Sequence, residues 1–166
     1  MKRGEIRWYT FKLPDKRRPV LILTRDEAGQ VLQTGSDSVL AVFDVASAAL
    51  NRALEIQRVL DAPPPVPGTH GPPLIRIGLH TGEVLIREGE RVEIISRHIR
   101  RARSVMEAAD PGQILASEAV VEAARDFIQI PSEHLALQYY GEYYLKGVGA
   151  ASLCEVADLR FRKPAP

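Results

Sequence analysis

The stretch IRIGLHTGEV, residues 75–84, decides how this chain folds. Within it Ile75, Ile77 and Leu79 alternate with polar residues or glycine, which is the period of two expected of a half-buried strand. Gly82 supplies a turn into a second short apolar segment. The stretch therefore predicts a strand, a tight turn and a second strand.

Further motifs lie around this stretch in a definite order. They are GSDSVLAVF at 35–43, RRAR at 100–103, AADPGQILAS at 108–117 and YLKGV at 144–148. The first predicts a hairpin strand followed by a helix over 45–60, and the next two predict a long helix over about 93–109 with its exit turn and strand. Together with residues 75–84, these motifs resemble class III adenylyl/guanylyl cyclase homology domains over about residues 29–157.

The resemblance implies an α+β fold, a ferredoxin-like cyclase homology domain lacking its first strand and helices, with an N-terminal β appendage. At most six residues separate the apolar run 20–24 from Val31. A crossover to a parallel strand needs about a dozen residues or more. We therefore expect residues 20–24 to pair antiparallel with 31–33 at the sheet edge. The empty place beside 75–79 should then make the protein self-associate.

Residues 1–28 form a separate predicted segment, followed by the cyclase homology domain at 29–157 and a tail at 158–166. RGEIRW at 3–8 and KRRPVLILTRD at 16–26 resemble the opening two strands of MazF-like endoribonuclease toxins. In that family an Arg directly before Pro acts on the scissile phosphate, and it corresponds here to Arg18. The toxin's remaining strands are absent, so a toxin-antitoxin RNase fragment is an alternative rather than the main prediction.

Composition excludes several classes of protein. The 166 residues include 22 Lys and Arg against 21 Asp and Glu, a net charge of +1, so nothing in the charge balance requires nucleic acid or an anionic membrane. No apolar run reaches the roughly 18 residues of a membrane span. The lone Cys154 cannot form an internal disulfide and is expected to be a small buried residue. We expect a cytoplasmic protein with no nucleic-acid partner and no membrane contact.

The family resemblance also assigns candidate site residues. Nucleotide cyclisation in this family uses two carboxylates that hold two divalent cations, a pair of polar residues that read the purine, and an Asn and an Arg that stabilise the transition state. Asp37 stands at the second metal carboxylate, so Mg²⁺ or Mn²⁺ is the expected cofactor if binding is retained. Gln33 stands at the purine-reading Lys and is the candidate substrate-binding residue, and Arg103 stands at the catalytic Arg.

The other positions depart from the family pattern. The first metal carboxylate belongs to the missing strand, with Asp26 only a remote substitute. Val92 replaces the second purine-reading residue and cannot hydrogen-bond through its side chain. Ile99 replaces the Asn, and because it shares a helical stripe with Met106 it is expected in the core. His80 is expected to be a hydrogen-bonded strand histidine, and the tyrosines at 139–144 to be strand packing residues rather than a nucleic-acid platform.

These substitutions predict a domain of cyclic-nucleotide signalling that is inactive alone. It would act as a dimerisation or regulatory module, as a homodimer or with a second cyclase domain, with weak ATP or GTP binding left open. A second alternative is the half-site of a heterodimeric cyclase whose partner supplies the missing carboxylates.

Overall fold

The computed structural model describes residues 3–7, 19–22, 30–34, 38–61, 74–83, 85–87, 93–95 and 97–162. Its first half contains β1 (Arg3–Arg7), β2 (Pro19–Ile22), β3 (Gln30–Thr34), β4 (Val39–Phe43), α1 (Ala46–Asp61), β5 (Arg76–Leu79), β6 (Gly82–Glu83), β7 (Leu85–Arg87) and β8 (Glu93–Ile95). Its second half contains α2 (Arg97–Ala108), β9 (Ile114–Ser117), α3 (Glu118–Ala124), the 3₁₀ turn η1 (Arg125–Phe127), β10 (Leu135–Leu145) and β11 (Gly149–Asp158).

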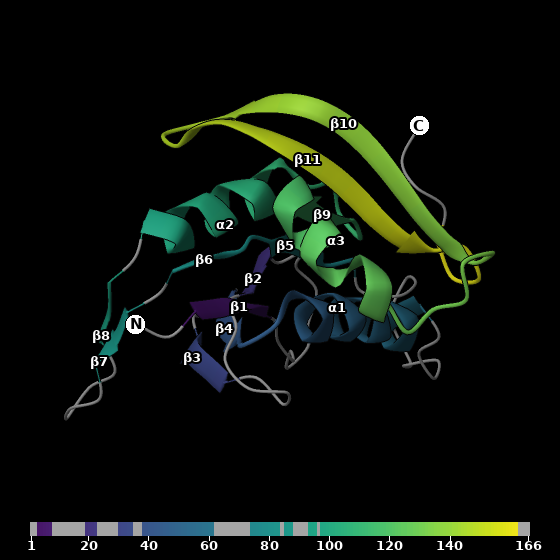
Figure 1. The fold of residues 1–166 in the computed structure, drawn as a ribbon, viewed down its shortest axis with the longest axis horizontal. Coiled ribbons are helices and arrows are strands. Elements are labelled where there is room, and N and C mark those ends of the chain that lie inside the picture. The colour runs from purple at the N-terminus through teal and green to yellow at the C-terminus, as the bar shows by residue number, and fades with distance from the viewer. Residues whose placement is uncertain are drawn as a thin grey trace, which may run out of the picture.

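The strands form two main sheets, the first of mixed direction and the second antiparallel. One has the order β10-β11-β9-β5-β2 and the other β3-β4-β1-β6, while β7 and β8 pair separately. Helix α2 packs on β5, β2 and β9, and α1 packs on α3 and β1. Figure 1 shows the long β10–β11 hairpin curving over α2, with α1 and α3 together at one end. The α+β prediction is confirmed, and no helix among the described residues is long and apolar enough to cross a membrane.

The core follows the predicted periodicity. Ile75, Ile77 and Leu79 are buried in one cluster with apolar residues of α1, including Leu50. A second, smaller cluster joins α2 to the hairpin through Val105, Leu145 and Leu153 and their neighbours. Strand β5 thus forms as residues 75–84 predicted, and its alternating side chains anchor α1.

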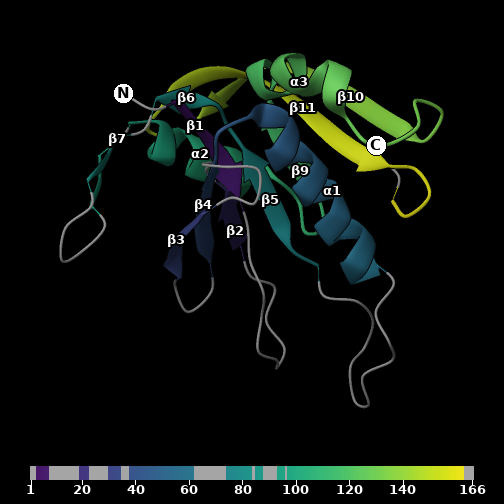
Figure 2. The same ribbon diagram turned by 60° about the horizontal axis from the view of Figure 1, so that its bottom comes forward.

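The predicted pairing of residues 20–24 is wrong. Strand β2 pairs parallel with β5, from Pro19 beside Arg76 to Ile22 beside Leu79. Strand β3 instead pairs antiparallel with β4. Strand β2 lies between β5 and β4 (Figure 2). The place that was predicted to be empty is filled, so the predicted self-association loses its structural basis.

The predicted pairing failed because closeness in the sequence does not determine which strand β2 pairs with. Its apolar run suits a buried strand, and the edge of β5 offered backbone groups that would otherwise be unpaired. Strand β1 likewise pairs with β4 and β6. The likeness of residues 1–28 to a toxin and the boundaries at 28 and 157 stay predictions.

The long helix begins later than predicted. Residues 93–95 are strand β8, paired with β7, and α2 starts at Arg97. Two consecutive β-branched residues, Ile94 and Ile95, favour a strand at this point. The helix ends as expected near Asp110, where Gln113 N donates to Asp110 O and Gly112 adopts a φ of 88°.

Candidate functional site

The three predicted site residues are unequally described. Arg103 lies on α2 with its side chain 59% exposed, and its Nε is 3.7 Å from Oε1 of Glu107 one turn later. The backbone of Gln33 lies in β3, opposite Leu40 of β4 and beside a register shift. Asp37 lies outside the described residues, as do Arg18, Asp26 and Val92. Of the three predicted site residues, Arg103 is the one whose side chain the structure describes, on the exposed side of α2.

Ile99 lies where the helical stripe predicted. It is partly buried and packs against the main core cluster, in which Ala102 and Met106 from the same helix are fully buried. An isoleucine side chain neither donates nor accepts a hydrogen bond. The prediction that this position is core is confirmed.

A chain of three polar side chains joins β5, α2 and β9. His80 is buried, its Nδ1 is 3.0 Å from Ser117 Oγ, and its Nε2 is 3.1 Å from His98 Nδ1. The two imidazoles stack with centroids 5.3 Å apart. Burial, followed by the nearby charges of His98 and Arg101, lowers the pKa of His80 to about 3. His80 is hydrogen-bonded as predicted, but it lies directly after β5 and not within the strand.

Gly82 makes this arrangement possible. A Cβ at residue 82 would lie 2.2 Å from the His98 ring. The ring of His98 therefore rests directly against the backbone of the turn after β5. The requirement for glycine comes from this contact as well as from the turn.

A second polar network was not anticipated. The carboxylate of Glu155 on β11 is 2% exposed and accepts hydrogen bonds from Gln113 Nε2 at 2.7 Å and Tyr140 OH at 2.5 Å. Gln113 Oε1 also accepts from Asp110 N. The one signal in the sequence was a glutamate inside the apolar run 153–157. Burial, reinforced by the hydrogen bond to Glu155, raises the pKa of Tyr140 to about 12.

Replacement of Tyr140 should change the free energy of unfolding by an amount that depends on pH. The folded pKa of Tyr140 lies above the ordinary value of 10.0, so its stabilisation is complete below pH 10.0 and is lost as pH rises toward about 12. Tyr140→Phe removes a donor to a buried carboxylate and should lower the free energy of unfolding by about 1–3 kcal/mol at neutral pH. The difference should shrink in alkali, as measured by urea unfolding at a series of pH values. Tyr143→Phe, at a more exposed tyrosine, is the control and should change little.

The described residues do not form a metal centre. Among them no group of three His, Cys, Asp or Glu side chains could hold a metal ion. Cys154 is buried, and burial raises the pKa of its thiol to about 12, so it is the buried apolar residue that was expected and not a nucleophile.

Comparison with known proteins defines the class of the fold. No protein-family model and no curated protein matches the chain. Solved structures of adenylate and guanylate cyclase catalytic domains match about four fifths of it. The chain therefore has the fold of a cyclase homology domain, as residues 75–84 and the accompanying motifs predicted.

Three of these structures illustrate the likeness. An adenylate/guanylate cyclase/hydrolase from Silicibacter pomeroyi is 26% identical, with 79% of this chain and 73% of that chain covered and a TM-score of 0.61. The adenylyl cyclase CyaB from P. aeruginosa is 20% identical over 80% and 73%, with a TM-score of 0.64. An adenylate cyclase from Trypanosoma brucei in its monomeric state is 19% identical over 84% and 74%, also with a TM-score of 0.64.

Proposed function

We propose that this chain is a cyclase homology domain of cyclic-nucleotide signalling that forms no cyclic nucleotide by itself. It acts as a dimerisation or regulatory module, paired with a second copy or with another cyclase domain. The observation that carries the proposal is the packing of Ile99 against the core, at the position where the family has its transition-state Asn. An isoleucine has no hydrogen-bonding group, so the reacting phosphate would lack that donor here.

The rate loss expected from the substituted catalytic positions is large enough to support inactivity. Loss of one preorganised donor typically lowers the rate by roughly 10²–10³. Here Val92 removes a purine contact as well. Arg103 alone would supply one guanidinium, and its ion pair with Glu107 is a long, exposed one that orients the side chain weakly.

The exposure of Arg103 favours one alternative, the half-site of a heterodimeric cyclase. A side chain that is 59% exposed on α2 can reach a nucleotide presented by another domain. In such a pair Gln33 would contact the base. Any Mg²⁺ or Mn²⁺ would have to be held by carboxylates of the partner together with Asp37.

Cyclic-nucleotide assays test the proposal. The purified chain, incubated with ATP or GTP and Mn²⁺, should give no cyclic AMP or cyclic GMP above background, with an active cyclase as positive control. Turnover that is lost in both Asp37→Ala and Arg103→Ala would contradict it. If activity arises only on mixing with a second cyclase domain and is lost in Arg103→Ala, the half-site alternative replaces it. The matched control is Arg58→Ala, at an exposed arginine in the last turn of α1.

A further inference from the structure

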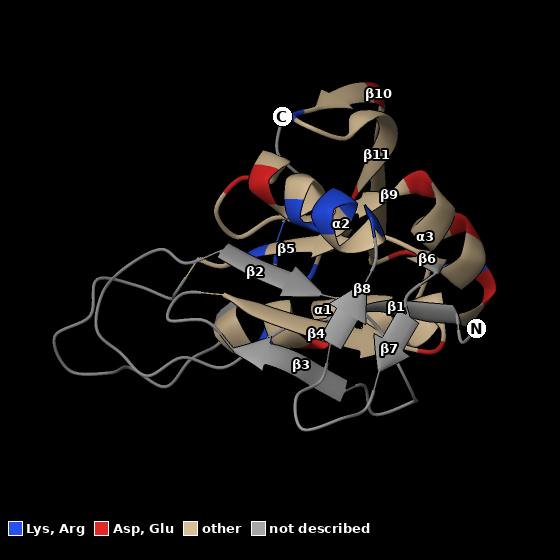
Figure 3. Ribbon diagram, turned by 90° about the vertical axis from the view of Figure 1, so that its left-hand side faces the viewer, with Lys and Arg blue, Asp and Glu red and all other residues tan. Residues whose placement is uncertain are grey.

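Strand β10 lies at the edge of the larger sheet. In the order β10-β11-β9-β5-β2, the described part of the chain gives β10 one paired neighbour, β11. Residues 138–144 of this strand are all exposed, and Figure 3 shows the hairpin mostly tan beside the blue of α2 and the red of α3. The strand contains neither lysine nor proline, the residues that commonly protect an exposed edge. Such an edge can accept another strand.

The backbone of Tyr144 is directed toward this edge. Tyr144 pairs with Ala150 of β11, and Ala150 O accepts its hydrogen bond from Nη2 of Arg101 at 3.2 Å. In an antiparallel ladder, the two residues of a non-hydrogen-bonded pair direct their N–H and C=O groups away from each other. The N–H and C=O of Tyr144 therefore point outward, as do those of Glu142 two residues earlier.

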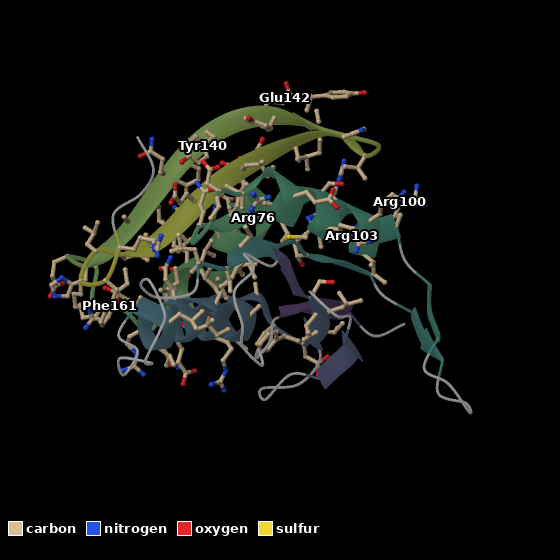
Figure 4. The ribbon with its side chains drawn as sticks, turned by 180° about the vertical axis from the view of Figure 1, so that it is seen from behind. Arg76, Arg100, Arg103, Tyr140, Glu142 and Phe161 are labelled. Atoms are coloured by element: carbon tan, nitrogen blue, oxygen red, sulfur yellow. The ribbon has the colours of Figure 1, made fainter. Side chains whose placement is uncertain are left out.

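The side chains of Glu142 and Tyr144 share the face of the hairpin that α2 does not cover. Leu145, the next residue, packs in one cluster with Val105 of α2, so the alternation of the strand places Tyr144 on the opposite face. Tyr144 is 81% exposed. Figure 4 shows Glu142 on the outer side of the hairpin, away from the labelled arginines of α2.

The charges along this segment are their own complement. Glu142, Tyr144 and Lys146 are exposed and occupy every second position. If two copies pair antiparallel about a two-fold axis at Tyr144, Glu142 of each copy lies opposite Lys146 of the other, and the two Tyr144 residues lie opposite each other. Pairing about Glu142 would place two carboxylates together, and pairing about Tyr143 would leave both charges unpaired. Cross-strand charge therefore selects the axis at Tyr144.

We propose that two copies of this chain join through the edge of β10, as an antiparallel ladder over residues 142–146 centred on Tyr144. The register shift between Tyr139 and Gly141, where Gly141 has a φ of 73°, bends the strand and limits the ladder to this end. A ladder this short buries little area, so the dimer is weak and forms at high concentration. The inference rests on the proposed function, in which the chain pairs with a second copy, and adds the surface through which it pairs.

Disulfide crosslinking tests the register. Tyr144→Cys should form a linked dimer in oxidised glutathione, because directly opposite residues have Cα atoms about 5.5 Å apart, within the span of a disulfide. Tyr143→Cys is the matched control, since each new thiol would lie opposite residue 145 of the other copy and the two Cα atoms would be more than about 7 Å apart. A mixture of Glu142→Cys and Lys146→Cys should crosslink more than either variant alone. The parent has its one cysteine buried and gives the background.

Exchange of the charges tests their complementarity. In sedimentation velocity at rising concentration, Glu142→Lys should weaken self-association about tenfold, since two attractive cross-strand pairs become repulsive. Glu142→Lys/Lys146→Glu should restore it, and an equimolar mixture of Glu142→Lys and Lys146→Glu should associate as well. Glu133→Lys changes an exposed glutamate outside the hairpin and should associate as the parent does. Circular dichroism melts verify that each variant is folded.

Three outcomes would overturn the inference. They are a parent that stays monomeric at every concentration, a dimer that Glu142→Lys does not weaken, and crosslinking of Tyr143→Cys as readily as Tyr144→Cys. A dimer with either of the last two results pairs through another surface, and a monomeric parent leaves pairing with another cyclase domain, so the proposed function stands in each case. Cyclic-nucleotide production by the chain alone would contradict the proposed function without bearing on the edge of β10.

Discussion

Acidification from pH 7 to about pH 4.5 should lower the free energy of unfolding by roughly 2–3 kcal/mol through His80 alone. The pKa of His80 falls from 6.5 to about 3 on folding because the side chain is buried and faces the charges of His98 and Arg101. Between pH 6.5 and about pH 3, His80 is therefore protonated in the unfolded chain and neutral in the folded chain. The stabilisation is complete above pH 6.5 and declines as pH falls toward about 3.

Urea unfolding followed by circular dichroism at pH values from 7 down to 4.5 measures this effect. His80→Gln keeps a polar side chain beside Ser117 but has no imidazole to protonate, so its stability should vary much less with pH. His134→Ala changes a histidine outside this network and is the matched control; it should keep most of the parent's slope, because His134 is the smallest of the effects that lower the pKa of Asp158. Some slope remains in every variant, because Arg160 hydrogen bonds lower the pKa of Asp158, whose stabilisation is also lost in acid. An unchanged slope in His80→Gln would contradict the prediction.

Gly78→Ala should destabilise the fold by about 3 kcal/mol or more. A Cβ at residue 78 would lie 2.4 Å from Met106 N and 2.5 Å from Met106 Cα, so it would meet the backbone of α2 rather than a movable side chain. Strand β5 and α2 would have to separate, and the sheet centre and the helix are both parts of the core. Thermal melts and urea unfolding give the magnitude.

Gly82→Ala is the comparison for Gly78→Ala, because its added Cβ meets a side chain and not a backbone. Its Cβ would meet the His98 ring, a side chain that a second substitution can remove. Gly82→Ala/His98→Ala should therefore recover stability relative to Gly82→Ala, whereas Gly78→Ala/Met106→Ala should recover none, because the backbone atoms of residue 106 remain. If Gly78→Ala/Met106→Ala recovered stability, the backbone contact between β5 and α2 would not be the cause of the destabilisation.

The elements with a strong local pattern could be predicted from the sequence. Alternation at residues 75–79 predicted β5, and the period of α2 placed Ile99 and Met106 in the core. These are consequences of side-chain direction within one element, which depends on the chain's own geometry. The start of α2 was predicted too early, since helical spacing and a short strand cannot be separated over 93–95.

Strand pairing and buried hydrogen bonds could not be predicted, because they depend on which distant elements pack together. The apolar run 20–24 predicted a strand but was assigned the wrong partner, because the parallel pairing of β2 with β5 joins residues more than 50 positions apart. The hydrogen bonds among Gln113, Tyr140 and Glu155 arise from the register of β9, β10 and β11. The class of fold and the strand near 75–79 could be predicted from the sequence alone, because each depends on local periodicity and residue type. The place of β2 and the burial of His80 against Ser117 and His98 became evident in the tertiary structure and not in the sequence, because strand pairing and burial are properties of contacts between distant segments.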